Sequence, residues 1–147
     1  MSGQVLPYFA RGKVIKGFGR GSKELGCPTA NFDEEVVNNL PEDLNTGVYY
    51  GFGQVNGGQV HKMVMSVGWN PFYHNSKKSM EVHLLHKFEC DFYGEELRIV
   101  ILGFLRAEKN FASLEELIKA IEYDIMMAKN ALEEPENAVF ISNPFFS

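Results

Sequence analysis

Six short segments rich in β-branched and aromatic residues, each bounded by turn residues, constrain the fold of this chain more than any other feature. Two of them flank Asn56-Gly57-Gly58, residues that tolerate positive φ, so the sequence predicts a β-hairpin there. The predicted strands cover residues 8–16, 28–32, 48–55, 60–67, 80–88 and 95–106. The 147 residues have the length of one domain, and six strands favour a mainly β fold over residues 1–147. We expect a closed or nearly closed antiparallel β-barrel with Greek-key-like connections.

One helix is predicted after the last strand. Ser113 precedes Glu116 by three residues, which is the spacing of a capping box, and Pro135 is expected to end the helix. Between them, apolar residues recur with a helical period at Leu114, Leu117, Ile118, Ile121, Ile125, Ala128 and Leu132. Such a stripe is typical of a helix face packed on a core. We therefore expect this helix to lie against the outside of the barrel.

The net charge of −5 argues against a broad basic surface for DNA or RNA, although 14 Lys and Arg could still form a local phosphate pocket. Cys27 and Cys90 form no CxxC pair and suggest neither a zinc site nor a disulfide framework, which suits a reducing cytosol. The first residues lack a signal-peptide pattern, and no stretch reaches the roughly 20 apolar residues that span a bilayer. We expect a cytoplasmic protein that binds neither nucleic acid nor membranes. Because no unburied apolar helix is obvious, a monomer is expected.

A glycine-rich loop between the first two predicted strands is the first candidate for chemistry. Gly17, Gly19 and Gly21 alternate, with Lys23 close behind, and successive N–H groups of such a loop can surround a phosphate. The loop matches neither GxxxxGK(S/T) nor GxGxxG, because Ser22 stands where the third glycine should be. On the glycines alone, a flexible surface turn is the simpler interpretation.

Thr29 and Asn31 follow this loop in the short predicted strand 28–32. Two residues apart on an extended chain, they lie on one side of it. Both carry neutral oxygens, which Mg²⁺ accepts beside water and phosphate oxygens. Without the loop before them, a turn in which both side chains bind nearby backbone is the better interpretation.

Six motifs in a fixed order strengthen these candidates. They are residues 12–31 (GKVIKGFGRGSKELGCPTAN), 46–51 (TGVYYG), 66–73 (SVGWNPFY), 77–83 (KKSMEVH), 91–94 (DFYG) and 104–111 (FLRAEKNF). The set resembles the riboflavin kinases (flavokinases) in their monofunctional eukaryotic form. The resemblance implies a six-stranded antiparallel barrel with a C-terminal helix packed outside. It also implies ATP-dependent phosphorylation of riboflavin at its ribityl 5′-hydroxyl to give FMN and ADP. No adenylyltransferase segment precedes the motifs, so we expect FMN rather than FAD as the product.

The resemblance also implies the roles of individual residues. Glu81 would be the general base, and Thr29 and Asn31 would hold a divalent metal, Mg²⁺ or alternatively Zn²⁺ or Mn²⁺. Contacts to the co-substrate ATP would come from Gly17, Lys23, Thr29, Asn31, Leu84, His86 and Tyr93. Flavin contacts would come from Arg106, Lys109 and Phe111. Riboflavin and ATP are thus the expected small-molecule partners.

Glu81 suits the role of a base on chemical grounds. A primary alcohol is a poor nucleophile, and a positioned carboxylate that accepts its proton contributes about 10²–10⁴-fold to the rate. In a regular strand Glu81 and His83 share one face, while Leu84 and His86 share the other. Leu84 and His86 would then reach a nucleotide through their backbone or across a β-bulge. The opposite directions of His83 and His86 also argue against a metal shared by the two.

Two other functions remain open on the sequence. A flavin-binding module without turnover would need no carboxylate at Glu81, and an oligonucleotide-binding barrel would need a basic and aromatic strand face that is not evident in this acidic chain. Trp69, Phe72 and Tyr73 could stack on the flavin ring, although aromatic residues in such loops more often pack a lid or core. The predicted loops 18–26 and 68–79 are candidate lids over the site.

Overall fold

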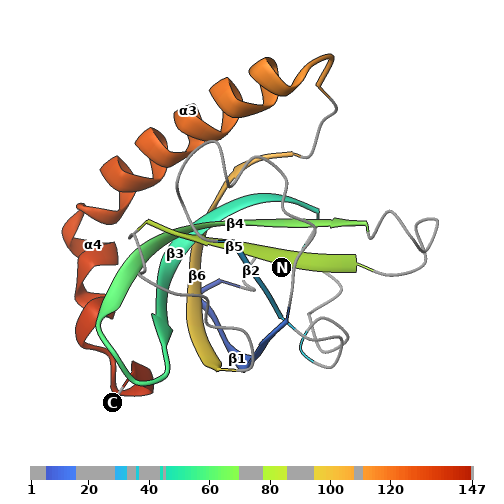
Figure 1. Ribbon diagram of the computed structural model, residues 1–147. Helices are drawn as coiled ribbons and strands as arrows, with labels where there is room; N and C mark the ends of the chain where they lie inside the picture. Colours follow the sequence, from blue (N-terminus) through green and yellow to red (C-terminus); the bar gives the residue numbers. More distant parts are fainter. Residues whose placement is uncertain are drawn as a thin grey trace.

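Six antiparallel strands of the computed structural model close into a barrel (Figure 1). The structure describes residues 6–15, 29–32, 36, 44, 46–69, 78–85, 95–107 and 111–146. The strands are β1 (Tyr8–Ile15), β2 (Thr29–Phe32), β3 (Gly47–Val55), β4 (Val60–Trp69), β5 (Lys78–Leu84) and β6 (Glu96–Arg106). They follow the order β1-β2-β5-β4-β3-β6, and β6 pairs with β1 to close the barrel. The predicted six-stranded antiparallel barrel is confirmed.

The strand order is that of a Greek key. β3, β4 and β5 are consecutive neighbours, and β6 returns to pair with β3, which gives the spatial order β6-β3-β4-β5. The connection between β3 and β4 is the predicted hairpin. Asn56 and Gly57 at its tip adopt φ angles of 51° and 74°, the positive values that the sequence there tolerates.

Apolar residues at every second position of the strands fill the barrel interior. On β5 these residues are Met80, Val82 and Leu84, and all three are fully buried. Glu81 and His83 lie between them and therefore face the outside of the barrel. The interior core also includes Val14, Phe32, Leu44, Tyr49, Met63, Met65, Val67, Leu97, Ile99 and Ile101.

Helix α3 (Leu114–Leu132) lies along the outside of the barrel, where Figure 1 shows it extending beside the sheet. The Ser113 side chain accepts a hydrogen bond from the Glu116 N–H at 3.2 Å, so the predicted helix start is confirmed. Ala128 packs with Val48 of β3 and Val64 of β4. The outer face of these two strands is therefore covered by the apolar side of α3, as expected.

Other apolar side chains of α3 remain in contact with solvent. Leu114, in the first turn, is 53% exposed although it belongs to the predicted packing stripe. Tyr123, Met126 and Met127 are also exposed. The premise of the expected monomer, that no helix exposes apolar residues, is therefore wrong for α3. The oligomeric state itself stays a prediction.

Beyond α3 the chain forms α4 (Pro135–Ala138) and two 3₁₀ turns, Val139–Ser142 and Pro144–Phe146. α3 ends before Pro135 as predicted, but the proline then opens α4, because its fixed φ suits the first position of a helix. Gln54 Nε2 donates a hydrogen bond to the Phe146 carbonyl at 2.9 Å, and Arg98 Nη1 donates one to the Phe145 carbonyl at 3.1 Å. These bonds fasten the C-terminal segment to β3 and β6. No helix within the described residues is long and apolar enough to cross a membrane.

The strand ends differ from the prediction around residues 68–79. β4 continues through Gly68 to Trp69, and β5 begins at Lys78, with Trp69 opposite Lys78 in the register. Backbone pairing does not require apolar side chains, so the polar composition of this stretch concealed both strand ends. Phe72 and Tyr73 lie outside the described residues.

Candidate active site

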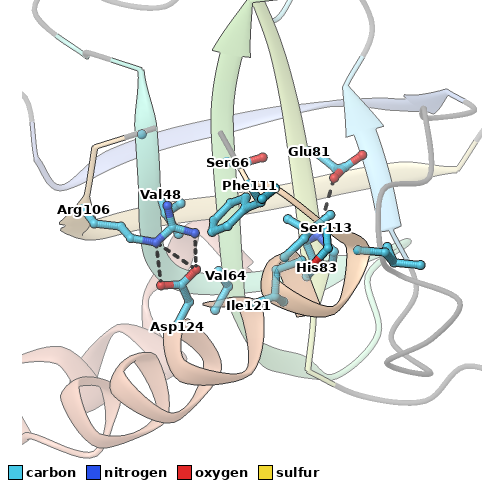
Figure 2. Close-up of a pocket in the computed structure, with 14 residues that line it drawn as sticks. Val48, Val64, Ser66, Glu81, His83, Arg106, Phe111, Ser113, Ile121 and Asp124 are labelled. Carbon is cyan, nitrogen blue, oxygen red and sulfur yellow. Dashed lines mark hydrogen bonds and ion pairs between the residues drawn. The ribbon is translucent and has the colours of Figure 1, made fainter. Parts of the chain in front are cut away.

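A cavity of about 690 Å³ lies between the outer face of the barrel and α3, and Figure 2 shows its walls. Its lining comes from the sheet (Gly47, Val48, Val64, Ser66, Glu81 and His83), from the end of β6 and the chain that follows (Arg106, Phe111, Ala112 and Ser113) and from α3 (Leu114, Leu117, Ile121 and Asp124). The volume falls within the range of roughly 300–1,000 Å³ that is typical of small-molecule sites. The barrel and α3 thus form a pocket large enough for a small organic substrate.

One row of paired residues crosses five strands along this pocket. Asn31 of β2 is opposite Glu81 of β5, which is opposite Ser66 of β4. Ser66 is in turn opposite Val48 of β3, which is opposite Arg106 of β6. Because directly paired residues share a face of the sheet, the row places Glu81 and Arg106 on the same outer surface. Three strand spacings of about 4.8 Å separate them by roughly 14 Å along the sheet. The pocket therefore has two distinct ends.

Glu81 and His83 form the first end. Glu81 Oε1 lies 3.5 Å from His83 Nε2, and the two side chains are only 12% and 6% exposed. His83 Nδ1 is buried and has no hydrogen-bond partner among the described residues. Figure 2 shows the two side chains close together at one side of the pocket. This end offers a shielded carboxylate that can accept a proton, with an imidazole beside it.

An ion pair forms the second end. Arg106 Nη2 lies 2.8 Å from Asp124 Oδ2, and Arg106 Nε lies 3.0 Å from Asp124 Oδ1. Asp124 is buried, with 3% of its surface exposed. The Arg106 guanidinium carbon also lies 5.6 Å from the centroid of the Phe111 ring, within the range of a cation–π contact. Because the two charges offset each other, this end attracts an anion less than an unpaired arginine would.

The wall between the two ends is mainly apolar. Val48 and Val64 contribute to it from the sheet, and Leu117 and Ile121 contribute from α3. Ser66 adds a hydroxyl beside Glu81. A mainly apolar pocket with a few polar groups at fixed positions is typical of a site that binds and orients a small organic molecule.

Three of the predicted site residues, Glu81, Arg106 and Phe111, line this pocket together. Leu84 does not, because its side chain is buried in the barrel core. The pairing of β4 with β5 continues regularly from Leu84 to Lys78, without the bulge that was one of the two possibilities. A nucleotide contact of Leu84 would therefore have to come from its backbone.

Thr29 and Asn31 lie on the strand next to Glu81 and His83. Thr29 is opposite His83 and Asn31 is opposite Glu81 in the β2–β5 register. The two predicted metal ligands therefore lie on the strand that pairs with that of the predicted base, and Asn31 is directly opposite Glu81. The other predicted site residues lie outside the described residues; they are Gly17, Lys23, His86, Tyr93 and Lys109.

Three pocket residues, Ser66, His83 and Asp124, are not predicted as such from the sequence. A signal for Asp124 is present in the sequence, because a carboxylate there interrupts the apolar stripe between Ile121 and Ile125. Charged residues on a packed helix face are rarely buried without a partner. No comparable signal distinguishes Ser66, whose place in the row depends on the strand register.

Known proteins resemble this chain over nearly its full length. Residues 4–132 match the flavokinase family model, described as riboflavin kinase. The riboflavin kinase of Homo sapiens is 61% identical over 141 residues, which cover 96% of this chain and 91% of that protein. The bifunctional riboflavin kinase/FMN phosphatase of Arabidopsis thaliana is 48% identical over 96% of this chain and 37% of that protein. The crystal structure of riboflavin kinase from Trypanosoma brucei matches with a TM-score of 0.74 at 30% identity, covering 94% of this chain and 87% of that one. The chain therefore belongs to the riboflavin kinase family.

Proposed function

We propose that this chain transfers the γ-phosphate of ATP to the ribityl 5′-hydroxyl of riboflavin, giving FMN and ADP, with Glu81 as the general base. The overall reaction follows from membership of the riboflavin kinase family. The observation that supports the division of roles is the paired row from Asn31 through Glu81 to Arg106. In our proposal the phosphates lie at the Asn31 end of this row, Glu81 accepts the proton, and the flavin ring lies at the Arg106 end.

The flavin ring occupies the end of the pocket beside Phe111 and Arg106, with Lys109 as a further contact. The uncharged ring suits an end where the arginine is neutralised by Asp124. From there the ribityl chain extends past the Ser66 hydroxyl, which can bind one of its hydroxyls. Its 5′-hydroxyl then reaches Glu81.

Glu81 accepts the proton of this hydroxyl as the oxygen attacks the γ-phosphorus and the bond to the β–γ bridging oxygen of ATP breaks. A carboxylate that is only 12% exposed is shielded from competing water, and His83 at 3.5 Å can hold it in orientation. Such a base supplies about 10²–10⁴-fold of the rate acceleration. Alignment of the two substrates and stabilisation of phosphate charge supply most of the remainder.

ATP lies on the β2 side of Glu81. Its contacts come from Gly17, Lys23, Thr29, Asn31, His86 and Tyr93, and from the backbone of Leu84. No three His, Cys, Asp or Glu side chains of the described residues form a metal site by themselves. The proposed cation is shared with the nucleotide and held by the oxygens of Thr29 and Asn31, which suit Mg²⁺; Zn²⁺ and Mn²⁺ stay the alternatives. When bound, the cation neutralises charge on the phosphate oxygens.

The oligomeric state that we propose is a monomer. The enzyme works in the cytoplasm, without nucleic acid or a membrane as a partner. The net charge of −5 and the absence of a CxxC pair or a paired cysteine framework in the sequence support this setting.

Incubation with riboflavin, ATP and Mg²⁺, followed by chromatography, tests the proposal. We expect FMN that forms only when ATP is present. Tight riboflavin binding without FMN under Mg²⁺, Mn²⁺ or Zn²⁺ would reject the kinase reaction and identify a flavin-binding module instead.

A further inference from the structure

Asp124 is a buried charge for which the proposed reaction has no direct use. It lies on α3 between Ile121 and Ile125, on the side that faces the barrel, and is 3% exposed. A lone carboxylate is costly to bury, so this position requires a partner. Arg106 supplies the partner, because its Nε and Nη2 both donate to the carboxylate at 2.8 to 3.2 Å.

The ion pair fixes the orientation of more than one residue. Arg106 is the last residue of β6, and its Nη1 donates to the Ala107 carbonyl at 3.3 Å. Its guanidinium also lies against the Phe111 ring, which Figure 2 shows between the two ends of the pocket. A two-point contact with a carboxylate permits one plane of the guanidinium, whereas a single contact would let it turn. Asp124 thus sets the plane of Arg106, and Arg106 in turn supports Phe111.

We propose that Asp124 is a positioning residue for riboflavin, which holds the ring-binding end of the pocket in shape through Arg106 and Phe111. It touches none of the reacting atoms. This inference rests on the proposed function, because it takes the Arg106 end as the place of the ring. Its effect is confined to riboflavin, since the phosphate side lies beyond Glu81 at the opposite end of the row.

A second ion pair between the same helix and the barrel provides a matched control. Lys62 Nζ of β4 lies 3.3 Å from Glu133 Oε2 at the C-terminal cap of α3. These side chains are 30% and 70% exposed, and neither lines the pocket. If Asp124 only held α3 against the barrel, Asp124→Asn would change the KM for riboflavin and the KM for ATP alike. Glu133→Gln would then show the same pattern, with a different magnitude.

Steady-state kinetics of the wild type, Asp124→Asn, Asp124→Glu and Glu133→Gln test the inference. In Asp124→Asn we expect the KM for riboflavin to rise about 10-fold or more, because a charge-assisted partner of Arg106 is lost. The KM for ATP and kcat should stay within about twofold, as should all constants of Glu133→Gln. Asp124→Glu keeps the charge but moves the carboxylate by one methylene, so it should give an intermediate riboflavin KM.

An unchanged riboflavin KM in Asp124→Asn, or equal rises for both substrates, would overturn the inference. If circular dichroism shows that Asp124→Asn is unfolded, Asp124→Glu is tested instead. The inference then predicts that its KM for riboflavin rises while its KM for ATP does not, and any other result rejects it. If the wild type makes no FMN, the proposed function fails and this inference is tested by riboflavin fluorescence quenching. Binding that is as tight in Asp124→Asn as in the wild type would then reject it.

Discussion

The two ends of the pocket differ in what holds their side chains in place. At the first end Glu81 stands on a strand paired on both sides, opposite Asn31 and Ser66, so backbone hydrogen bonding determines its position. At the second end Arg106 takes its orientation from Asp124 on α3, so the wall depends on side-chain contacts between helix and barrel. It follows that the barrel backbone fixes the position of the proposed base, while the shape of the proposed ring-binding end depends on the ion pair between Arg106 and Asp124. Changes at the first end should alter turnover or metal use, and changes at the second should alter riboflavin binding.

The largest expected effect lies at the first end. Glu81→Gln removes the proton acceptor but keeps the shape of the side chain, so kcat should fall by about 10²–10⁴-fold. ATP affinity, measured by equilibrium binding, should be unchanged. Glu96→Gln on β6 is the matched control, because Glu96 pairs with Arg98 away from the pocket and its loss should leave kcat unaltered. Near-normal turnover in Glu81→Gln would remove Glu81 as the base.

Asn31→Ala should affect the same end, because we propose Asn31 as a ligand of the divalent metal. We expect the Mg²⁺ concentration for half-maximal activity to rise by about 10-fold, within the range seen when groups around a metal are removed. The riboflavin KM should stay constant, in contrast to substitutions beside Arg106. Asn130→Ala, on the exposed side of α3, serves as the control. A metal requirement equal to that of the wild type would reject Asn31 as a ligand.

Phe111→Ala should affect the second end of the pocket. Loss of the aromatic contact should raise the riboflavin KM by about 3–10-fold, without a change in the metal requirement or the KM for ATP. Tyr123→Ala removes an exposed aromatic ring from α3 and should leave the riboflavin KM as it is. A change in the KM for ATP in Phe111→Ala would show that the two ends of the pocket are not independent.

The smallest expected effect concerns the start of α3. Ser113→Ala removes the side chain that accepts from the Glu116 N–H, so the free energy of unfolding should fall by about 1 kcal/mol in urea denaturation. Ser142→Ala, at an exposed position in a 3₁₀ turn, should stay within about 0.5 kcal/mol of the wild type. Equal stabilities of the two variants would contradict the capping role.

The barrel and its strands could be predicted because their signals are local. The hairpin at Asn56 and Gly57 and the helix start at Ser113 depend on residues close together in the chain, and the structure has both. The alternation along β5 likewise predicts that Glu81 and His83 lie on the face opposite to Leu84, and Leu84 is buried in the core. The role of general base for Glu81 comes only from the motif set. Neither the composition of the chain nor the position of Glu81 in a strand predicts it.

The rest depends on contacts between residues distant in sequence. Neither the pairing of Asn31 with Glu81 nor that of Val48 with Arg106 has a local signal, because register is decided when the whole barrel closes. The interruption of the apolar stripe at Asp124 signals a buried carboxylate but does not identify its partner. Only the structure pairs it with Arg106, which lies 18 positions earlier in the chain.

A crystal structure with FMN and MgADP bound would show directly which end of the pocket holds the flavin ring. We predict the isoalloxazine ring against Phe111 and Arg106, and the FMN phosphate next to Glu81 on the β2 side. A ring bound beside Glu81 with the phosphate toward Asp124, or FMN bound outside this pocket, would contradict the account.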